Sequence, residues 1–232
     1  NPHGGTKKGP FLLEKVKPIF DACGAELFII ETTFAGHAQA LANQLNLSDY
    51  DGFIGIGGDG TLHEITNGML SRQDGNKIPI GIIPGGSGNS YMHDLGLTDP
   101  IQATKSIIKG NTCPVDAARV EVNHVVKYAI NMIGWGLVTD VGNLAEHYRW
   151  LGPSRYTIFS VVEVLRHKSR SATLIMDDKK IEDEFTFIIA CTSIHVGKGM
   201  KMAPRAKLDD GIIDLILVRS GTSRARLLQV FP

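Results

Sequence analysis

Residues 53–70 read FIGIGGDGTLHEITNGML, and this stretch decides the fold. The apolar run 53–56 is typical of a buried strand, and residues 62–70 have the spacing of an amphipathic helix. Between them lies the glycine turn GGDGT, residues 57–61. A strand, a turn and a helix in this order predict one unit of a parallel α/β sheet, with the turn at the edge where such sheets bind ligands.

The same alternation extends on both sides of this stretch. Apolar runs at 27–30 and 78–83 predict two more buried strands, with helices between them. Further along, β-strands joined by short polar turns follow, interrupted by a helical stretch at 140–167. We therefore expect an α/β fold with two domains, a Rossmann-like parallel-sheet domain at 1–113 and an antiparallel β-rich sandwich domain at 114–232.

Composition excludes several classes of protein. The 24 basic and 24 acidic side chains balance, whereas a nucleic-acid-binding protein shows a clear basic excess. No apolar run reaches the length of a membrane span, and we expect no signal peptide. The three cysteines are far apart and odd in number, so we expect reduced thiols and a cytoplasmic location.

Two glycine turns point to phosphate binding. In the first, Gly57, Gly58 and Gly60 let the backbone approach a phosphate chain, and the helix that follows presents backbone amides to negative charge. The second turn, PGGSGN, follows the next predicted strand and offers Gly86, Ser87 and Gly88. Two such loops after consecutive strands favour one shared nucleotide cleft. Neither loop has the Gly-Lys-Ser/Thr of a Walker A motif or the dinucleotide fingerprint.

Asp59 is the unusual residue of the first turn, because a carboxylate stands where phosphate would be attracted. It could accept a proton from an attacking hydroxyl, hold Mg²⁺, or merely cap its own turn. The strand–turn–helix setting favours one of the two functional roles. Thr61 belongs to the same nucleotide-binding turn, although Thr61 and Glu64 also have the spacing of a structural capping box.

A third glycine-rich segment, NPHGGTKKG, occupies residues 1–9 before the first helix. The three loops together resemble the diacylglycerol kinase catalytic-domain family. The resemblance continues through GWG, YRWLG, MAP, DG and VRSG, at residues 134–136, 148–152, 202–204, 210–211 and 218–221. These last segments are most similar to the sphingosine kinase branch. The resemblance implies an ATP-dependent lipid kinase that uses Mg²⁺ and phosphorylates a hydroxyl of a sphingoid-type lipid presented by a membrane.

The resemblance also assigns roles to single residues. Asp59 matches the expected catalytic base, and the lipid would enter from the second domain. The positions that match nucleotide contacts are Asn1, Gly4, Thr32, Ser87, Arg149 and Arg155. Two guanidinium groups at 149 and 155 fit the stabilisation of phosphoryl charge, although surface solvation of a helix accounts for such arginines without a ligand.

Two departures from the family pattern matter. Sphingosine kinases carry a second acid, two positions after the residue matching Asp140, that pairs with the lipid ammonium; here that position is Gly142. Asp140 could replace this acid, or the lipid could have an uncharged head, as ceramide and diacylglycerol do. Second, the family's acidic Asp-Gly-Glu motif does not follow Ser220, so we expect this chain either to bind nucleotide weakly or to be inactive.

Other functions stay open from the sequence. NAD kinases and phosphofructokinases also use a Gly-Gly-Asp-Gly turn, although the later segments favour a lipid kinase. A catalytically silent nucleotide- or lipid-binding module is the alternative from a different class. The sequence also leaves open whether the protein forms a homodimer, while association with the membrane surface is expected of an enzyme that acts on a lipid.

Overall fold

The computed structural model describes residues 1–4, 7–152, 154–166 and 168–230, except for the side chains of residues 149 and 228–230. The chain divides into two compact units. Residue 113, after which the second domain is predicted to begin, lies inside the first unit, and that division stays a prediction. The first unit comprises Asn1–Asn131 and Thr192–Ile212, and the second Met132–Cys191 and Ile213–Pro232.

A parallel pair of strands forms the centre of the first unit. Strand β1 (Phe53–Gly57) pairs with β2 (Ile80–Pro84), and helix α3 (Asp59–Leu70) connects them. Successive side chains of β2 point to opposite faces, as strand geometry requires: Ile82 belongs to one hydrophobic cluster and Ile83 to another. Because α3 directly follows β1 and the turn at Gly58, the strand–turn–helix unit predicted around residues 53–70 is present.

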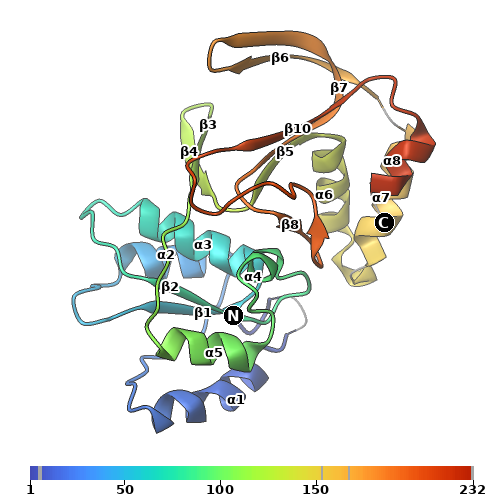
Figure 1. Ribbon diagram of the computed structural model, residues 1–232. Coiled ribbons are helices and arrows are strands. Elements are labelled where there is room, and N and C mark those ends of the chain that lie inside the picture. Colours follow the sequence, from blue (N-terminus) through green and yellow to red (C-terminus); the bar gives the residue numbers. More distant parts are fainter. Residues whose placement is uncertain (5–6, 153, 167, 231–232) are drawn as a thin grey trace. The chain divides into compact units, whose positions relative to one another are not determined.

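Helices cover both faces of this pair, as Figure 1 shows. The cluster around Ile82 includes residues of α2 (His37–Gln44) and α3, and the cluster around Ile83 includes residues of α1 (Gly9–Ala22) and α5 (Pro100–Ile108). The short helix α4 (Ser90–Asp94) lies between β2 and α5 in the chain. Helix α5 begins as its sequence predicts, because Asp99 accepts a hydrogen bond from the backbone N–H of Gln102 at 2.8 Å.

The buried strand predicted at 27–30 is wrong. These residues are assigned to no strand, and the side chains of Phe28, Ile29 and Ile30 are 66%, 44% and 37% exposed. An extended segment becomes a strand only when a neighbouring segment completes its hydrogen bonds. Among the described residues, β1 forms its ladder with β2, and no ladder includes 27–30.

The first unit also contains an antiparallel hairpin of β3 (Ala118–Val122) and β4 (Val125–Ala129). The buried side chain of Asn67, on α3, fastens it. Its amide donates to the carbonyl of Tyr128 at 2.8 Å, and its oxygen accepts from the N–H of Tyr128 at 2.8 Å. One amide side chain thus bonds the strand as a neighbouring strand would.

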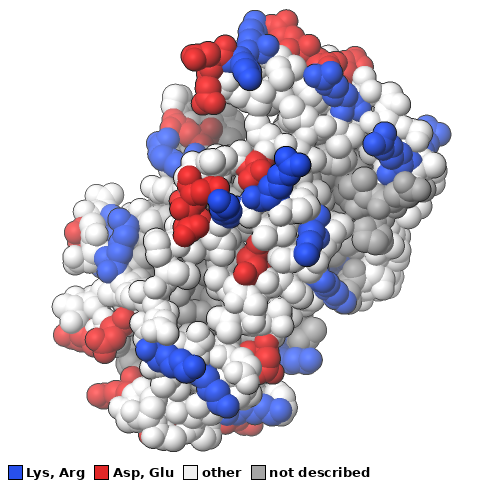
Figure 2. All heavy atoms as spheres, in the orientation of Figure 1, with Lys and Arg blue, Asp and Glu red and all other residues white. Residues whose placement is uncertain are grey.

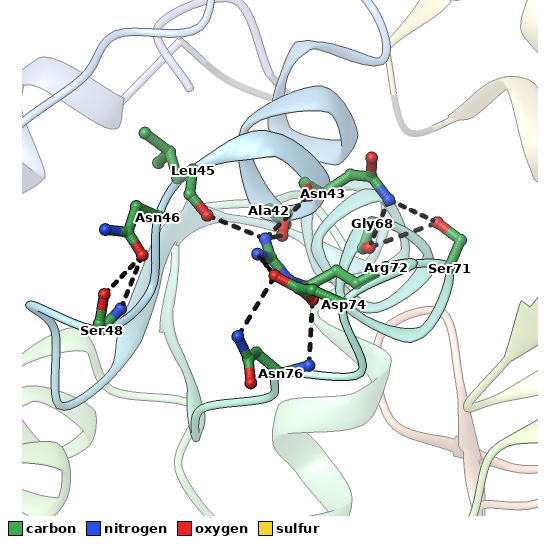
Figure 3. Close-up of polar contacts among 10 residues, drawn as sticks. All are labelled: Ala42, Asn43, Leu45, Asn46, Ser48, Gly68, Ser71, Arg72, Asp74 and Asn76. Carbon is green, nitrogen blue, oxygen red and sulfur yellow. Dashed lines mark hydrogen bonds and ion pairs between the residues drawn. The ribbon is translucent and has the colours of Figure 1, made fainter.

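Arg72 closes the carboxyl end of α2 (Figure 3). Its Nη1 donates to three backbone carbonyls at 2.8–3.0 Å, those of Ala42, Asn43 and Leu45. The Arg72 side chain is only 5% exposed, and it pairs with Asp74, whose pKa this hydrogen bond lowers. A cation at a helix C-terminus satisfies carbonyls that lack a partner within the helix.

Four antiparallel strands form the sheet of the second unit. The long strand β7 (Lys179–Cys191) pairs with three others, which are β5 (Met132–Gly136), β6 (Arg170–Met176) and β10 (Asp214–Arg219). The apolar side chains of β7 at alternate positions, Phe185, Phe187, Ile189 and Cys191, are buried, and so is Thr186 between the first two. The predicted order, a parallel sheet followed by antiparallel strands, is confirmed.

Helices accompany this sheet in the same unit. They are α6 (Leu137–His147), the short 3₁₀ helix η1 (Arg149–Leu151), α7 (Ser154–Arg166) and α8 (Arg224–Val230). Helices α6, η1 and α7 thus lie where one helical stretch is predicted at 140–167, and residues 153 and 167 lie outside the described residues. None of the helices that the structure describes is long and apolar enough to cross a membrane. Figure 2 shows basic and acidic groups interspersed on the visible surface.

Candidate active site

Asp59 begins helix α3, directly after β1 and the N-cap residue Gly58. Its half-buried carboxylate accepts two hydrogen bonds, from the backbone N–H of Ser90 at 2.9 Å and that of Tyr91 at 3.0 Å. Both donors belong to α4, which follows the second glycine turn. Asp59 therefore caps a neighbouring helix rather than its own turn, and it ties the first glycine turn to the end of the second.

The two glycine turns touch through their backbones. A Cβ atom on Gly58 would lie 2.9 Å from the Cα of Gly86, and one on Gly86 would lie 2.5 Å from the Cα of Gly58. The N–H of Gly85 donates to the carbonyl of Gly57 at 2.8 Å. Asn89, at φ 52°, accepts from the N–H of Gly86 at 2.9 Å. Neither turn could carry a side chain at this contact unless its backbone moved.

The N-terminal glycine-rich segment, residues 1–9, contacts the chain around the first glycine turn, at the end of β1 and the start of α3. The backbone nitrogen of Asn1 donates to the carbonyl of Ile56 at 3.1 Å, and its side-chain amide donates to the hydroxyl of Thr61 at 3.2 Å. A Cβ on Gly4 would lie 3.0 Å from that amide nitrogen. Residues 5–6 of this loop lie outside the described residues. Parts of all three glycine-rich loops thus lie together in the first unit.

The capping box that the spacing of Thr61 and Glu64 would allow does not form, because α3 begins two residues before Thr61. The hydroxyl of Thr61 accepts a hydrogen bond from the side-chain amide of Asn1, and the carboxylate of Glu64 accepts one from the N–H of Gly36 at 2.9 Å. The first bond within the helix comes from the N–H of Leu62, and no described side chain caps the N–H groups before it. Uncapped amides at a helix N-terminus attract anions.

Two more predicted nucleotide contacts lie in the same unit. Thr32 is half-buried in the extended segment before α2, and the bond from Gly36 to Glu64 ties the end of this segment to α3. Ser87 is exposed at the tip of the second turn. Their contact with a nucleotide stays a prediction.

The remaining predicted site residues belong to the second unit. The Asp140 carboxylate, on α6, accepts two hydrogen bonds from Nη2 of Arg170, at 3.0 and 2.8 Å. The guanidinium of Arg155, on α7, donates to the carbonyl of Gly152 at 3.0 Å and to the hydroxyl of Tyr156 at 3.3 Å. The Arg149 side chain lies outside the described residues.

Sequence reasoning missed a buried acid beside the second turn. Asp94 ends α4 with a side chain 1% exposed. Its carboxylate accepts from the N–H groups of Ile194 at 2.7 Å and His195 at 3.2 Å, and the His195 ring nitrogen Nδ1 lies 3.3 Å away. No sequence signal connects positions 100 residues apart. The one available cue was an acid in the helix that directly follows a candidate phosphate loop.

Comparison with known proteins covers nearly the whole chain. Residues 1–120 match the model of the diacylglycerol kinase catalytic domain, and residues 131–232 match that of the YegS C-terminal NAD kinase beta sandwich-like domain. A crystal structure of a putative diacylglycerol kinase from Bacillus anthracis str. Sterne superposes with a TM-score of 0.82 at 28% identity. The match covers 100% of this chain and 75% of that one.

Curated relatives are lipid kinases. Sphingosine kinase 1 of Arabidopsis thaliana is 36% identical over 71% of this chain, and human ceramide kinase is 29% identical over 75%. The matched region is 36% of the length of each of these relatives, so the chain spans about a third of them. More than half of the chain matches the catalytic-domain model, and the chain therefore belongs to the diacylglycerol kinase catalytic-domain family.

Proposed function

We propose that the protein is an ATP-dependent lipid kinase that transfers the γ-phosphoryl group of ATP to a hydroxyl of a sphingoid-type lipid. One observation carries the proposal: the Asp59 carboxylate stands where two touching glycine turns meet, bonded to the backbone that follows the second turn. The curated relatives are named sphingosine kinases, sphingoid base kinases and ceramide kinase, which supports a lipid as the acceptor.

The phosphate chain of ATP would bind at the start of α3. Its first amides have no described side-chain cap, and the Gly58–Gly86 contact leaves backbone rather than side chains at the surface there. Backbone N–H groups at a helix start bind phosphate because their partial positive charge faces the anion. Asn1, Gly4, Thr32, Ser87 and Gly88 are the further contacts that we propose around it.

Asp59 would accept the proton of the lipid hydroxyl. An ionised carboxylate has about four acceptor positions, and the two described hydrogen bonds occupy two of them. The bonds also fix the carboxylate in one orientation, which a general base needs. Asp59 can therefore hold α4 in place and act as the base at the same time.

Mg²⁺ belongs to the proposal as the ion that would accompany ATP. Among the described residues, no group of three His, Cys, Asp or Glu side chains could hold a metal ion. Mg²⁺ in phosphotransferases is commonly held by one or two carboxylates together with phosphate oxygens and waters. Phosphate oxygens of the nucleotide and waters would therefore supply most of the ligands of the proposed Mg²⁺.

The arginines of the second unit would stabilise charge on the transferring phosphoryl group. A guanidinium has five N–H donors, and the described hydrogen bonds of Arg155 use two of them. Its buried Nε has no hydrogen-bond partner among the described residues. Its Nη2 also lies 3.7 Å from Oε1 of Glu146, so a phosphoryl oxygen would compete with this carboxylate for Arg155. We propose the same role for Arg149.

The charge of the lipid head group decides between a sphingoid base and a second candidate substrate. Asp140 is the acid proposed to meet a sphingoid ammonium, and Arg170 already pairs with it at 2.8 Å. A cationic head group would have to compete with this guanidinium, and Gly142 offers no second carboxylate. The ion pair thus favours an uncharged acceptor, ceramide or diacylglycerol, as the alternative substrate.

A membrane would present the lipid to the protein. Trp150, between α6 and α7, is 78% exposed, and aromatic side chains of this kind favour the membrane–water interface. We propose a cytoplasmic enzyme that associates peripherally with membranes. A homodimer stays a separate proposal that sedimentation of the purified protein would test.

The test is a transfer assay with radiolabelled ATP and the purified protein. Sphingosine, ceramide and diacylglycerol are offered in mixed micelles, with NAD and fructose 6-phosphate as acceptors of the rival families. Label on a lipid alone supports the proposal, and the preferred lipid decides between the two candidates. Retained ATP or lipid binding without transfer to any acceptor would instead identify a silent binding module.

A further inference from the structure

A short hairpin of the first unit presents a lysine beside the second glycine turn. Strand β8 (His195–Val196) pairs with β9 (Met200–Lys201), and the tip between them is Gly197-Lys198-Gly199. Both glycines have positive φ, 60° and 87°. The tip therefore adopts a backbone that favours glycine on both sides of one exposed lysine.

The base of this hairpin is fastened to α4. The buried carboxylate of Asp94 accepts the N–H groups of Ile194 and His195. The ring of His93, on the same helix, lies so close to Gly199 that a Cβ there would be 3.0 Å away. Figure 1 shows β8 beside α4. The hairpin is thus held to the helix that Asp59 caps.

The tip is fastened as well. The Ser90 hydroxyl donates to the carbonyl of Gly197 at 3.1 Å, and a Cβ on Gly88 would lie 3.1 Å from the same oxygen. The N–H of Ser90 is also a donor to Asp59. One residue therefore connects the proposed base to the peptide that precedes Lys198.

We propose that Lys198 binds the phosphate chain of ATP. The inference rests on the proposed function and adds a nucleotide contact that the sequence did not indicate. Phosphoryl transfer needs positive charge near the β- and γ-phosphates, and lysine supplies it as a point charge. Among the described residues Lys198 has no ion pair, so its ammonium is free to meet an anion.

A lysine that only keeps the surface soluble would not need this arrangement. Hydrogen bonds at both the base and the tip fix the hairpin, and Gly88 lets the peptide before Lys198 approach the second turn, because a Cβ there would lie 3.1 Å from the carbonyl oxygen of Gly197. Lys201, exposed on β9 of the same hairpin, lies away from the tip and serves as a matched control.

The experiment measures ATP and adenosine binding by calorimetry for the wild-type protein and for Lys198→Gln, Lys198→Arg and Lys201→Gln. Loss of a hydrogen bond to a charged group predicts that Lys198→Gln binds ATP about ten- to hundredfold more weakly. Adenosine affinity should stay unchanged, Lys198→Arg should retain most of the ATP affinity, and equal melting temperatures would exclude misfolding.

The outcomes separate this inference from the kinase proposal. ATP affinity of Lys198→Gln within twofold of Lys201→Gln would overturn the role of Lys198, even if the wild-type protein phosphorylates a lipid. Wild-type protein that binds ATP through Lys198 but transfers phosphate to no acceptor would support the inference and refute the kinase. Wild-type protein that binds no ATP would overturn both.

Discussion

Replacing Asp59 by asparagine separates its structural role from its proposed chemical one. The carboxylate accepts two backbone N–H groups, at 2.9 and 3.0 Å. Asparagine keeps one acceptor oxygen, now uncharged, and turns an amide NH₂ toward the second N–H, so one of the two bonds is lost and the other is weakened. Such a bond contributes about 1.5–3 kcal/mol, and the free energy of unfolding should fall by about that amount.

The expected effect on catalysis is much larger than the effect on folding. Loss of a general base lowers turnover by about 10²–10⁴-fold. A domain with a typical stability of about 5–15 kcal/mol would stay folded after the substitution, so unfolding cannot produce that loss. Urea denaturation gives the stability, and transfer of radiolabelled phosphate at saturating ATP and lipid gives kcat.

Asp99→Ala is the matched control. Asp99 caps α5 through the N–H of Gln102 at 2.8 Å, and removal of such a cap costs about 0.5–2 kcal/mol. This variant should lose stability and keep its kcat. A folded Asp59→Asn protein with undiminished turnover would refute the role of Asp59 as base and leave it a helix cap.

Three further predictions concern single side chains. Arg72→Met should lower the free energy of unfolding by about 1–3 kcal/mol in urea denaturation, because the three carbonyls that accept from the guanidinium lose their donor. Asn67→Asp should destabilise the protein by a similar amount, about 1–3 kcal/mol, because a carboxylate oxygen would face the carbonyl of the hairpin that now accepts from Nδ2. Burial raises the pKa of Cys191 to about 11, so at pH 8 an alkylating reagent should modify the exposed Cys23 and Cys113 and reach Cys191 only after unfolding, as counted by mass spectrometry.

Each of these has a result that would contradict it. Arg119 forms an exposed ion pair, so Arg119→Met should lower the free energy of unfolding by less than about 1 kcal/mol. An equally small decrease in Arg72→Met would contradict the stabilising role of the buried Arg72 guanidinium. Unchanged stability of Asn67→Asp would show that the hairpin does not depend on the amide. Rapid modification of all three thiols in the folded protein would contradict the burial of Cys191.

Local sequence signals predicted the centre of the first unit well. The strand at 53–56, the glycine turn and the helix to Leu70 all follow from spacing and from the preference of glycine for close backbone contacts. The start of α3 was placed too late, because Thr61 and Glu64 also fit a capping box. Their true partners, Asn1 and Gly36, are distant in sequence, and local spacing carries no information about them.

Predictions that depend on a distant partner failed or could not be made. The apolar run at 27–30 has the composition of a strand, but composition does not supply a neighbour with free hydrogen-bonding groups. The ion pair of Asp140 with Arg170 and the bonds of Asp94 to residues 194–195 join elements that only the folded chain brings together. The glycine turns beside Asp59 follow from the sequence and their role in binding stays a proposal, whereas the contacts that hold Asp94 and Asp140 could not be predicted.

Helix α3 carries a consequence of its own, because both of its ends are engaged. Asp59, in its first turn, accepts hydrogen bonds from the backbone of α4. Asn67, eight residues or about 12 Å further along the helix axis, bonds the backbone N–H and carbonyl of Tyr128. If β3 and β4 slipped by one position, those groups would turn to the opposite side of the strand. Helix α3 therefore fixes both the register of the β3–β4 hairpin and the position of the Asp59 carboxylate.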